Sequence, residues 1–401
     1  MLNESNTHSN TRKPDNLFEV LKVSTKLGLT SFGGPIAHLG YFHNEYVRKR
    51  KWMDERNYAD LVALCQFLPG PASSQIGIGI GTIRAGLLGG IMAWIGFTMP
   101  SIIAMVLFAF LLKGFDIGSS GWIHGLNVVA VAIVAQAVLS MGQKLASGRV
   151  KATIAVISAA AALLSPTAYS QVAIIILSGL FGLVIYRKMN VPENSIAPVQ
   201  ISKISSVLCI LAFFLLLILL PALRGLFPNQ PVALLDSFYR SGSLVFGGGH
   251  VVLPLLEREV VPTGWVTEQD FLAGYGATQA VPGPLFTFSA YLGAMALGIP
   301  GAIIATIGIF LPSFLLVIGI LPFWNGLRKN TKVQGALTGI NAAVVGILLA
   351  ALYNPLWTTA IHTSKDFALA SVLFGMLIFW KLPPWVVVIA GALGGVIVNV
   401  P

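Results

Sequence analysis

Long apolar segments follow one another from Leu17 almost to the last residue of this chain. By residue number, the clearest are 85–112, 125–141, 153–164, 171–186, 205–223, 302–321, 335–352, 367–380 and 385–400. A helix that crosses the apolar core of a bilayer needs about 20 such residues. Only 10% of the residues are charged, whereas soluble proteins have about 25%. The sequence therefore predicts an all-α polytopic membrane protein and excludes soluble enzymes, nucleic-acid binders and disulfide-rich secreted domains.

Four short motifs of the first half recur in the same order in the second half, always 212 to 214 residues later. The matched pairs are SFGGPIAHL (31–39) with VFGGGHVVL (245–253), QFLPGP (66–71) with QAVPGP (279–284), IGFTMPS (95–101) with IGIFLPS (307–313), and GLN (125–127) with GIN (339–341). A fixed separation of this kind indicates a duplicated structural unit.

The repeat divides the chain into four parts. Residues 1–16 are polar and lack the apolar core of a signal peptide, so we expect a disordered cytoplasmic tail. The first transporter repeat is expected at 17–187 and the second at 225–401. Between them, 188–224 holds a polar linker and one very apolar connecting helix.

The loop charges indicate that the two repeats have opposite orientations. The loop after the first glycine motif (43–56) holds five Lys or Arg, whereas its counterpart (257–270) holds one Arg and four acids. The contrast reverses at the next loop, where 113–124 holds one Lys and its counterpart holds Arg328, Lys329 and Lys332. It reverses again at the third loop, where the first half holds Lys144, Arg149 and Lys151 and the second half holds Lys365 alone. Basic loops lie on the cytoplasmic side of membranes, so we predict an inverted-topology repeat.

The same rule constrains the number of crossings. If loop 48–56 lies inside and loop 113–124 outside, an odd number of crossings separates them. Segment 85–112 is one crossing, so 58–83 is predicted to be a re-entrant hairpin turning at LPGPASS, with its counterpart at 267–297. With the FGGP and FGGG segments as further broken helices, the fold has about nine full spans and about four re-entrant segments.

Matched breaks in the helices also indicate where a ligand binds. Gly/Pro-interrupted segments at corresponding positions of two halves are typical of transporter binding sites. Each break exposes unpaired N–H groups at a helix start, which favour an anion. The candidate residues are Gly33, Gly34 and Pro35 with Gly247, Gly248 and Gly249, and Gly70 and Pro71 with Gly283 and Pro284, followed by the hydroxyls Ser73, Ser74, Thr287 and Ser289.

Two cations recur near these breaks. Lys26 and Arg240 each lie six residues before the phenylalanine of a glycine motif. A charge in apolar surroundings is costly unless it is used, so both could face a central cavity and pair with a dianion. The alternative is that both extend to the membrane interface. Arg84, whose counterpart is Ala296, is interpreted as an interface anchor.

Other polar residues are less decisive. Gln66 and Gln279 are matched and could donate to an oxyanion or bridge helices, whereas the matched pair Asn127 and Asn341 is interpreted as a helix bridge. His38 and His250 lie near the glycine motifs and could couple transport to protons, although a structural role is the alternative. The acids Glu19, Asp60 and Asp236 have no acidic counterpart, and we expect them at helix ends or in loops.

Motifs for catalysis or cofactor binding are absent from the sequence. It has no Walker A loop, HExxH or GxSxG motif, and its two cysteines, Cys65 and Cys209, have no metal-ligand spacing. The sequence therefore predicts neither an enzyme, nor a metal site, nor a cofactor, and transport driven by ATP within this chain is not expected.

The motifs resemble those of the chromate ion transporter (CHR) family in its long, two-domain form. The resemblance covers about 17–400 and is carried by SFGGPIAHLGYF, QFLPGPASSQ, VFGGGHVVLPLL and QAVPGPLFTFSAYLG. It implies a multi-pass inner-membrane protein that exports chromate and confers chromate resistance. Some members are thought to handle sulfate or other oxyanions.

Together these arguments predict a secondary active transporter of chromate or a related tetrahedral oxyanion, working by alternating access within the lipid bilayer. The alternatives are an oxyanion channel, a sulfate-type uptake transporter of the same architecture, or a membrane enzyme or assembly protein without transport. No nucleic-acid partner is expected, and the sequence leaves a monomer or a homodimer open.

Overall fold

The computed structural model describes residues 14–114, 121–186, 202–246, 248–327 and 330–398. Every regular element in this part of the chain is helical. The helices are α1 (Pro14–Thr30), α2 (Gly34–Phe42), α3 (Glu55–Phe67), α4 (Ala72–Gly114), α5 (Gly121–Leu145), α6 (Arg149–Leu164), α7 (Ala168–Ile185), α8 (Lys203–Leu226), α9 (Gln230–Leu244), α10 (Val252–Val260), α11 (Glu268–Thr278), α12 (Phe288–Ile320), α13 (Trp324–Leu327), α14 (Thr331–Ala351), α15 (Thr358–Ala360), α16 (Ser364–Ile378) and α17 (Pro384–Val398). Shorter 3-10 or π turns are η1 (His43–Lys49), η2 (Gly249–Val251), η3 (Leu285–Thr287), η4 (Leu321–Phe323) and η5 (Leu352–Trp357).

The same order of helices occurs twice. By the separation of the sequence motifs, α1 corresponds to α9, α2 to α10, α3 to α11, α4 to α12, α5 to α14, α6 to α16 and α7 to α17. Helix α8 has no counterpart and joins the two sets. It is longer than its predicted apolar core, and α1 begins at Pro14, within the predicted tail of residues 1–16. The rest of that tail and the linker 187–201 lie outside the described residues.

Helices α4 and α12 each contain a sharp reversal at matched positions. The backbone leaves the helical region at Ala85–Gly86 and at Leu297–Gly298. A Cβ added at Gly81 would collide with the carbonyl of Gly89, eight residues later. In a straight helix these residues would lie about 12 Å apart, so the chain folds back on itself. Each long helix is therefore a short arm followed by a long arm, packed through glycine.

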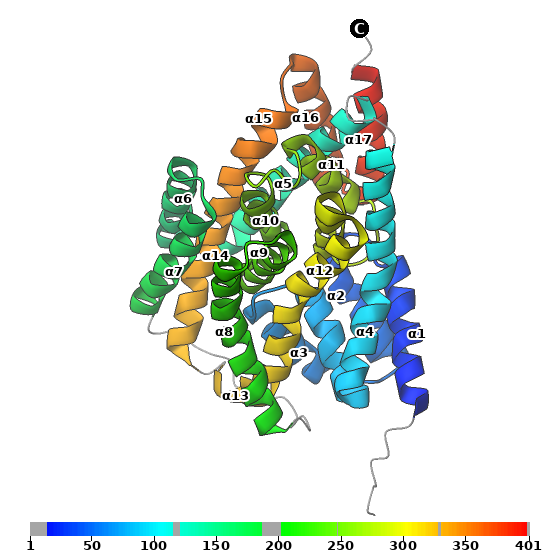
Figure 1. Cartoon of the computed structure of the whole chain (residues 1–401), viewed down its shortest axis with the longest axis vertical. Helices are drawn as coiled ribbons and strands as arrows, with labels where there is room; N and C mark the ends of the chain where they lie inside the picture. Colours follow the sequence, from blue (N-terminus) through cyan, green and yellow to red (C-terminus); the bar gives the residue numbers. More distant parts are fainter. Residues whose placement is uncertain (1–13, 115–120, 187–201, 247, 328–329, 399–401) are drawn as a thin grey trace, which may run out of the picture.

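The two repeats exchange their last helices. Helix α5 packs against α16 and α17 of the second repeat, whereas α14 packs against α6 and α7 of the first. In Figure 1, α6 and α7 lie beside α14 on one flank, and α17 lies near α5 on the other. Matched glycines allow the close approach: a Cβ at Gly125 would collide with the Gly391 carbonyl, and one at Gly339 with the Ser178 carbonyl.

Five stretches of the described residues are helical, long and apolar enough to cross a membrane: those containing α4, α5, α8, α12 and α14. Helix α8 carries exposed apolar side chains such as Ile218, which is 73% exposed, as expected of a surface against lipid. The helices α6, α7, α16 and α17 contain 15 to 18 residues, fewer than the roughly 20 of a typical crossing. The structure therefore supports the all-α membrane class, and the predicted number of full spans stays a prediction.

Candidate functional site

Two reciprocal hydrogen bonds join the broken segments of one repeat to those of the other. The N–H of Gly70, in the first PGP turn, donates to the carbonyl of Val245 at 2.7 Å. The N–H of Gly283, in the second PGP turn, donates to the carbonyl of Ser31 at 2.9 Å. The repeat matches Gly70 with Gly283 and Ser31 with Val245, so the same bond is made twice. We call this region the crossover; it comprises residues 31–34, 68–72, 245–246, 248–249 and 281–287.

Only glycine fits the two PGP turns. Gly70 has a φ of 117° and Gly283 a φ of 105°, a region that side chains rarely adopt. A Cβ at Gly70 would collide with Ser313 Oγ, and a Cβ at Gly283 with Ser101 Oγ. Ser101 also donates to the carbonyl of Pro282. The turn of each repeat is thus held against the long helix of the other.

Four helices begin at the crossover. Helix α2 begins directly after Gly33, whose φ is 96°, and α4 begins directly after the first PGP turn. Helices α10 and α12 begin after the short turns η2 and η3, which contact each other. Helix starts carry unpaired N–H groups and the positive end of the helix dipole. The crossover therefore concentrates partial positive charge without a buried cation.

Unpaired side-chain groups lie in the crossover or within two residues of it. The hydroxyls of Ser31 and Ser74 and the Nε2 of Gln279 are buried and have no hydrogen-bond partner among the described residues. Gln75 is fully buried, and its Nε2 donates to the carbonyl of Pro69 at 2.7 Å. Buried polar groups usually have partners, so the unpaired donors of Ser31, Ser74 and Gln279 are available to a ligand with acceptor oxygens.

Three of the other predicted side chains already have hydrogen-bond contacts, and one is exposed. His38 is buried, and its Nε2 lies 3.1 Å from the Ser31 carbonyl, whereas His250 Nδ1 lies 2.6 Å from the Tyr275 hydroxyl. The Thr287 hydroxyl already donates to Pro284 at 2.9 Å. Gln66 is exposed on the last turn of α3, so the matched glutamines do not share one environment.

The remaining candidates lie on the backbone of the breaks. Gly34 and Gly248 have φ values of 76° and 142°, and Gly249 begins η2. Pro35 is the second residue of α2; Pro71 and the neighbouring Ser73 are buried. Gly247 lies outside the described residues.

Lys26 and Arg240 are already paired with carboxylates. Lys26 Nζ lies 3.2 Å from Glu45 Oε2, and Arg240 Nη1 lies 3.0 Å from Glu259 Oε1. Arg240 Nη2 also lies 2.8 Å from Asp236 Oδ2. Either cation would have to exchange partners in order to bind a dianion.

These pairs correct one prediction and add residues that sequence reasoning missed. The expected placement at a helix end or in a loop is wrong for all three acids, since Glu19 lies inside α1 and Asp60 inside α3. Asp236 lies in the middle of α9 and is 2% exposed. It is buried because two arginines, Arg224 and Arg240, neutralise it. Glu45 and Glu259 are separated by 214 residues, so the repeat itself carried the signal. A count of loop charges includes these acids but does not pair them with Lys26 and Arg240.

Among the described residues, no group of three or more His, Cys, Asp or Glu could hold a metal ion. The donor set of the crossover consists of amide and hydroxyl hydrogens, which complement an anion rather than a cation.

Comparison with known proteins gives a consistent result. The model of the family described as "Chromate transporter" matches residues 18–183 and again residues 232–396. A probable chromate transport protein of Synechococcus elongatus is 27% identical over 393 residues, which is 95% of each chain. A chromate transport protein of Pseudomonas aeruginosa is 28% identical over 92% of this chain and 89% of its own, and one of Cupriavidus metallidurans is 24% identical over 94% and 91%. No solved structure matches the chain.

Proposed function

We propose that this chain, which belongs to the chromate transporter family, exports chromate across the inner membrane as a secondary transporter, by alternating access between its two repeats. The observation that carries the proposal is the crossover. Reciprocal hydrogen bonds between Gly70 and Val245 and between Gly283 and Ser31 bring four helix starts into one region.

The chemistry of the crossover fits a tetrahedral dianion. Chromate offers four acceptor oxygens, and charge-assisted hydrogen bonds to such oxygens are the strong ones. The proposed donors are the N–H groups at the starts of α2 and α4 and at the starts of the turns η2 and η3, which lead into α10 and α12, with the side chains of Ser31, Ser74 and Gln279. Sulfate has the same shape and charge, so we expect it to compete.

The reciprocal bonds also support an inverted arrangement of the repeats 17–187 and 225–401. Two copies of one unit that make the same contact to each other are related by a two-fold axis. With the basic loop 43–56 on the cytoplasmic side, the N-terminus is cytoplasmic and the two-fold axis lies in the membrane plane. The short arms of α4 and α12, with α3 and α11, then form re-entrant hairpins that end near the midplane.

The direction of transport follows from the membrane potential. An inside-negative potential favours the exit of anions by about 2.3 kcal/mol per charge per 100 mV, or about 4.6 kcal/mol for a dianion. Export therefore needs no nucleotide. Breaking and remaking the bonds at the crossover as the repeats rock against each other would expose the site to either side in turn.

The test is transport by purified protein in proteoliposomes. We expect saturable chromate flux that sulfate inhibits and that an inside-negative potential drives outward. A double variant, Gly70→Ala/Gly283→Ala, serves as the inactive control. Absence of chromate flux from well-folded wild-type protein would refute the proposal.

Two measurements separate this function from its alternatives. A channel would be indicated by chromate flux that does not saturate and that does not accumulate chromate against its concentration gradient once the membrane potential is collapsed. Flux of sulfate that chromate does not inhibit would indicate a sulfate-type transporter of the same architecture.

A further inference from the structure

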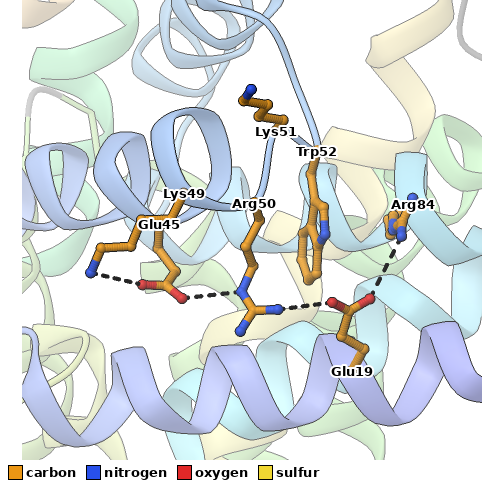
Figure 2. Close-up of a pocket in the computed structure, with 7 residues that line it drawn as sticks. All are labelled: Glu19, Glu45, Lys49, Arg50, Lys51, Trp52 and Arg84. Atoms are coloured by element: carbon orange, nitrogen blue, oxygen red, sulfur yellow. Dashed lines mark hydrogen bonds and ion pairs between the residues drawn. The ribbon is translucent and has the colours of Figure 1, made fainter.

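A second polar site lies outside the crossover, on the first repeat. It is an open pocket of about 500 Å³ between the start of α1, the end of η1, the loop that follows it and the reversal of α4 (Figure 2). We propose that this pocket binds a doubly charged tetrahedral oxyanion and delivers it to the crossover from one side of the membrane only. The delivery step rests on the proposed function, whereas the binding step does not.

The charges of the pocket carry the first part of the argument. Among the described residues, four cations line it, together with the carboxylates of Glu19 and Glu45. The cations are Lys49, Arg50, Lys51 and Arg84. The net formal charge is therefore +2, which matches the charge of the dianion.

One cation organises the pocket and is not itself available. Arg50 Nε lies 3.1 Å from Glu45 Oε1, and its Nη1 lies 2.8 Å from Glu19 Oε1. Its guanidinium also lies 5.6 Å from the centre of the Trp52 ring. Arg50 thus fixes the two carboxylates and the aromatic wall in place.

The other three cations are free enough to bind a ligand. Lys49 lies 3.7 Å from Glu45, and Arg84 lies 3.6 Å from Glu19, both at the long end of ion-pair distances. Lys51 makes no ion pair with any carboxylate of the described residues, and Figure 2 shows its side chain pointing away from the Glu45–Arg50–Glu19 chain. Both cations are exposed to solvent, and long ion pairs made by exposed cations are weak, so an incoming dianion can replace them.

The Trp52 ring separates two arginines of the pocket. Arg84 lies 5.4 Å from the centre of the Trp52 ring, and Figure 2 shows this ring between Arg84 and Arg50. Cation–π contacts hold a guanidinium without occupying its hydrogen-bond donors. Arg84 can therefore present these donors to an oxyanion while it stays in position.

The pocket is connected to the crossover through shared residues. Glu45 also binds Lys26, on the same helix as Glu19. Helix α1 runs from Glu19 past Lys26 to the break at residues 31–33, where Ser31 accepts the hydrogen bond from Gly283. An anion that weakens the pairs of Glu45 thus acts on the helix that forms one wall of the crossover.

The second repeat has no equivalent pocket chemistry. The next helix of each repeat is capped by Asp54 and by Thr267, 213 residues apart, so the positions of Lys49, Arg50, Lys51 and Arg84 are occupied there by Pro262, Thr263, Gly264 and Ala296. The glutamate and the tryptophan are kept, as Glu259 and Trp265. Because the repeat is otherwise matched, the pocket gives the transporter one side that attracts anions and one that does not.

The test compares three charge-removing variants. Lys51→Gln and Arg84→Gln remove pocket cations, and Arg48→Gln removes an exposed cation of the same segment that does not line the pocket. Sulfate binding to purified protein and chromate flux from the pocket side are both measured. We expect each pocket variant to raise the half-saturating concentration about two- to fivefold, with an unchanged rate at saturation, and Arg48→Gln to have no effect.

A conservative variant and added salt guard against structural damage. Lys51→Arg keeps the charge and should restore wild-type binding, and the differences should shrink at high ionic strength because exposed charges are screened. Wild-type affinity in both pocket variants, or an equal loss in Arg48→Gln, would overturn the proposal. If wild-type protein binds sulfate here but moves no chromate, the proposed function fails and the binding site stands.

A phosphate monoester of an anionic lipid has the same chemistry as the free ion. The second arm therefore uses protein in nanodiscs with and without phosphatidic acid. Free sulfate should bind in lipid that contains no phosphatidic acid. Binding of phosphatidic acid without any binding of free sulfate would overturn delivery of a soluble anion.

Discussion

The two repeats carry matched ion clusters that differ in net charge and in the exposure of their cations. In the first, Glu45 is shared by Lys26, whose side chain is 55% exposed, and by two further cations. In the second, Arg240 is 18% exposed and lies between Asp236 and Glu259, which are 2% and 9% exposed. With Arg224, the second cluster has two cations and two carboxylates and is formally neutral.

The difference shows how the same ion pair of a duplicated unit can have a different role in each repeat. The Lys26–Glu45 and Arg240–Glu259 pairs occupy matched positions, so the common unit contained one ion pair between the first helix and the segment after the break. In the second repeat the pair is enclosed and joins α8, α9 and α10. In the first repeat the carboxylate of Glu45 is equally buried, at 7% exposed, but its two lysines are more than half exposed to solvent. The same pair thus serves stability on one side and attraction of anions on the other.

The sharpest way to break the comparison is Arg240→Gln. It would leave Asp236 and Glu259 buried with only Arg224, and removing one partner of a buried ion pair costs about 3–5 kcal/mol. We expect a large fall in the thermal midpoint of the purified protein. Arg240→Lys, which keeps the charge but loses the forked geometry, should lie in between.

Matched substitutions in the two PGP turns of the crossover should have equal effects, unlike matched substitutions in the two ion clusters. Gly70→Ala and Gly283→Ala each force a side chain into a positive φ and against a serine of the other repeat, at a cost of about 1–3 kcal/mol. We expect each to abolish most chromate flux while the protein still folds. Full flux in one variant and none in the other would show that the two turns are not equivalent.

Lys26→Gln tests the exposed side of the comparison. Glu45 keeps Arg50 and Lys49 when Lys26 is lost, and an exposed pair contributes about 0–1 kcal/mol. We expect a change in thermal midpoint far smaller than that of Arg240→Gln. Equal destabilisation by the two variants would remove the distinction drawn between the clusters.

The smallest effect concerns pH. Glu45 lies outside the long apolar helices. Burial raises the pKa of its carboxyl, but the hydrogen bonds from Arg50 and Lys26 lower it by more, so the pKa lies below the ordinary 4.5. A carboxylate with a lowered pKa stabilises the folded state above its unfolded pKa and loses this contribution as pH falls through the folded pKa. The midpoints of wild type and Glu45→Gln should therefore differ by a constant amount between about pH 6 and 8 and converge below pH 4.5. A gap that widens on acidification would contradict this assignment.

Much of the fold could be predicted because it depends on local patterns. Apolar length defined most of the helices, and glycine and proline marked breaks such as Gly33 and Gly70. The contacts of Ser101 and Ser313 were not predictable, although both lie in recognised motifs, because a repeat shows which segments are alike and not which copies touch. For the same reason a comparison of matched residues does not single out Ser31, whose counterpart is Val245.

The exchange of last helices has a consequence for how the protein is made. During synthesis, α6 and α7 emerge well before α14, the helix against which they pack, and α5 must wait for α16 and α17. The first repeat therefore cannot complete its packing until nearly the whole chain is in the membrane. If the gene were split within the linker, the two products should accumulate only when they are expressed together.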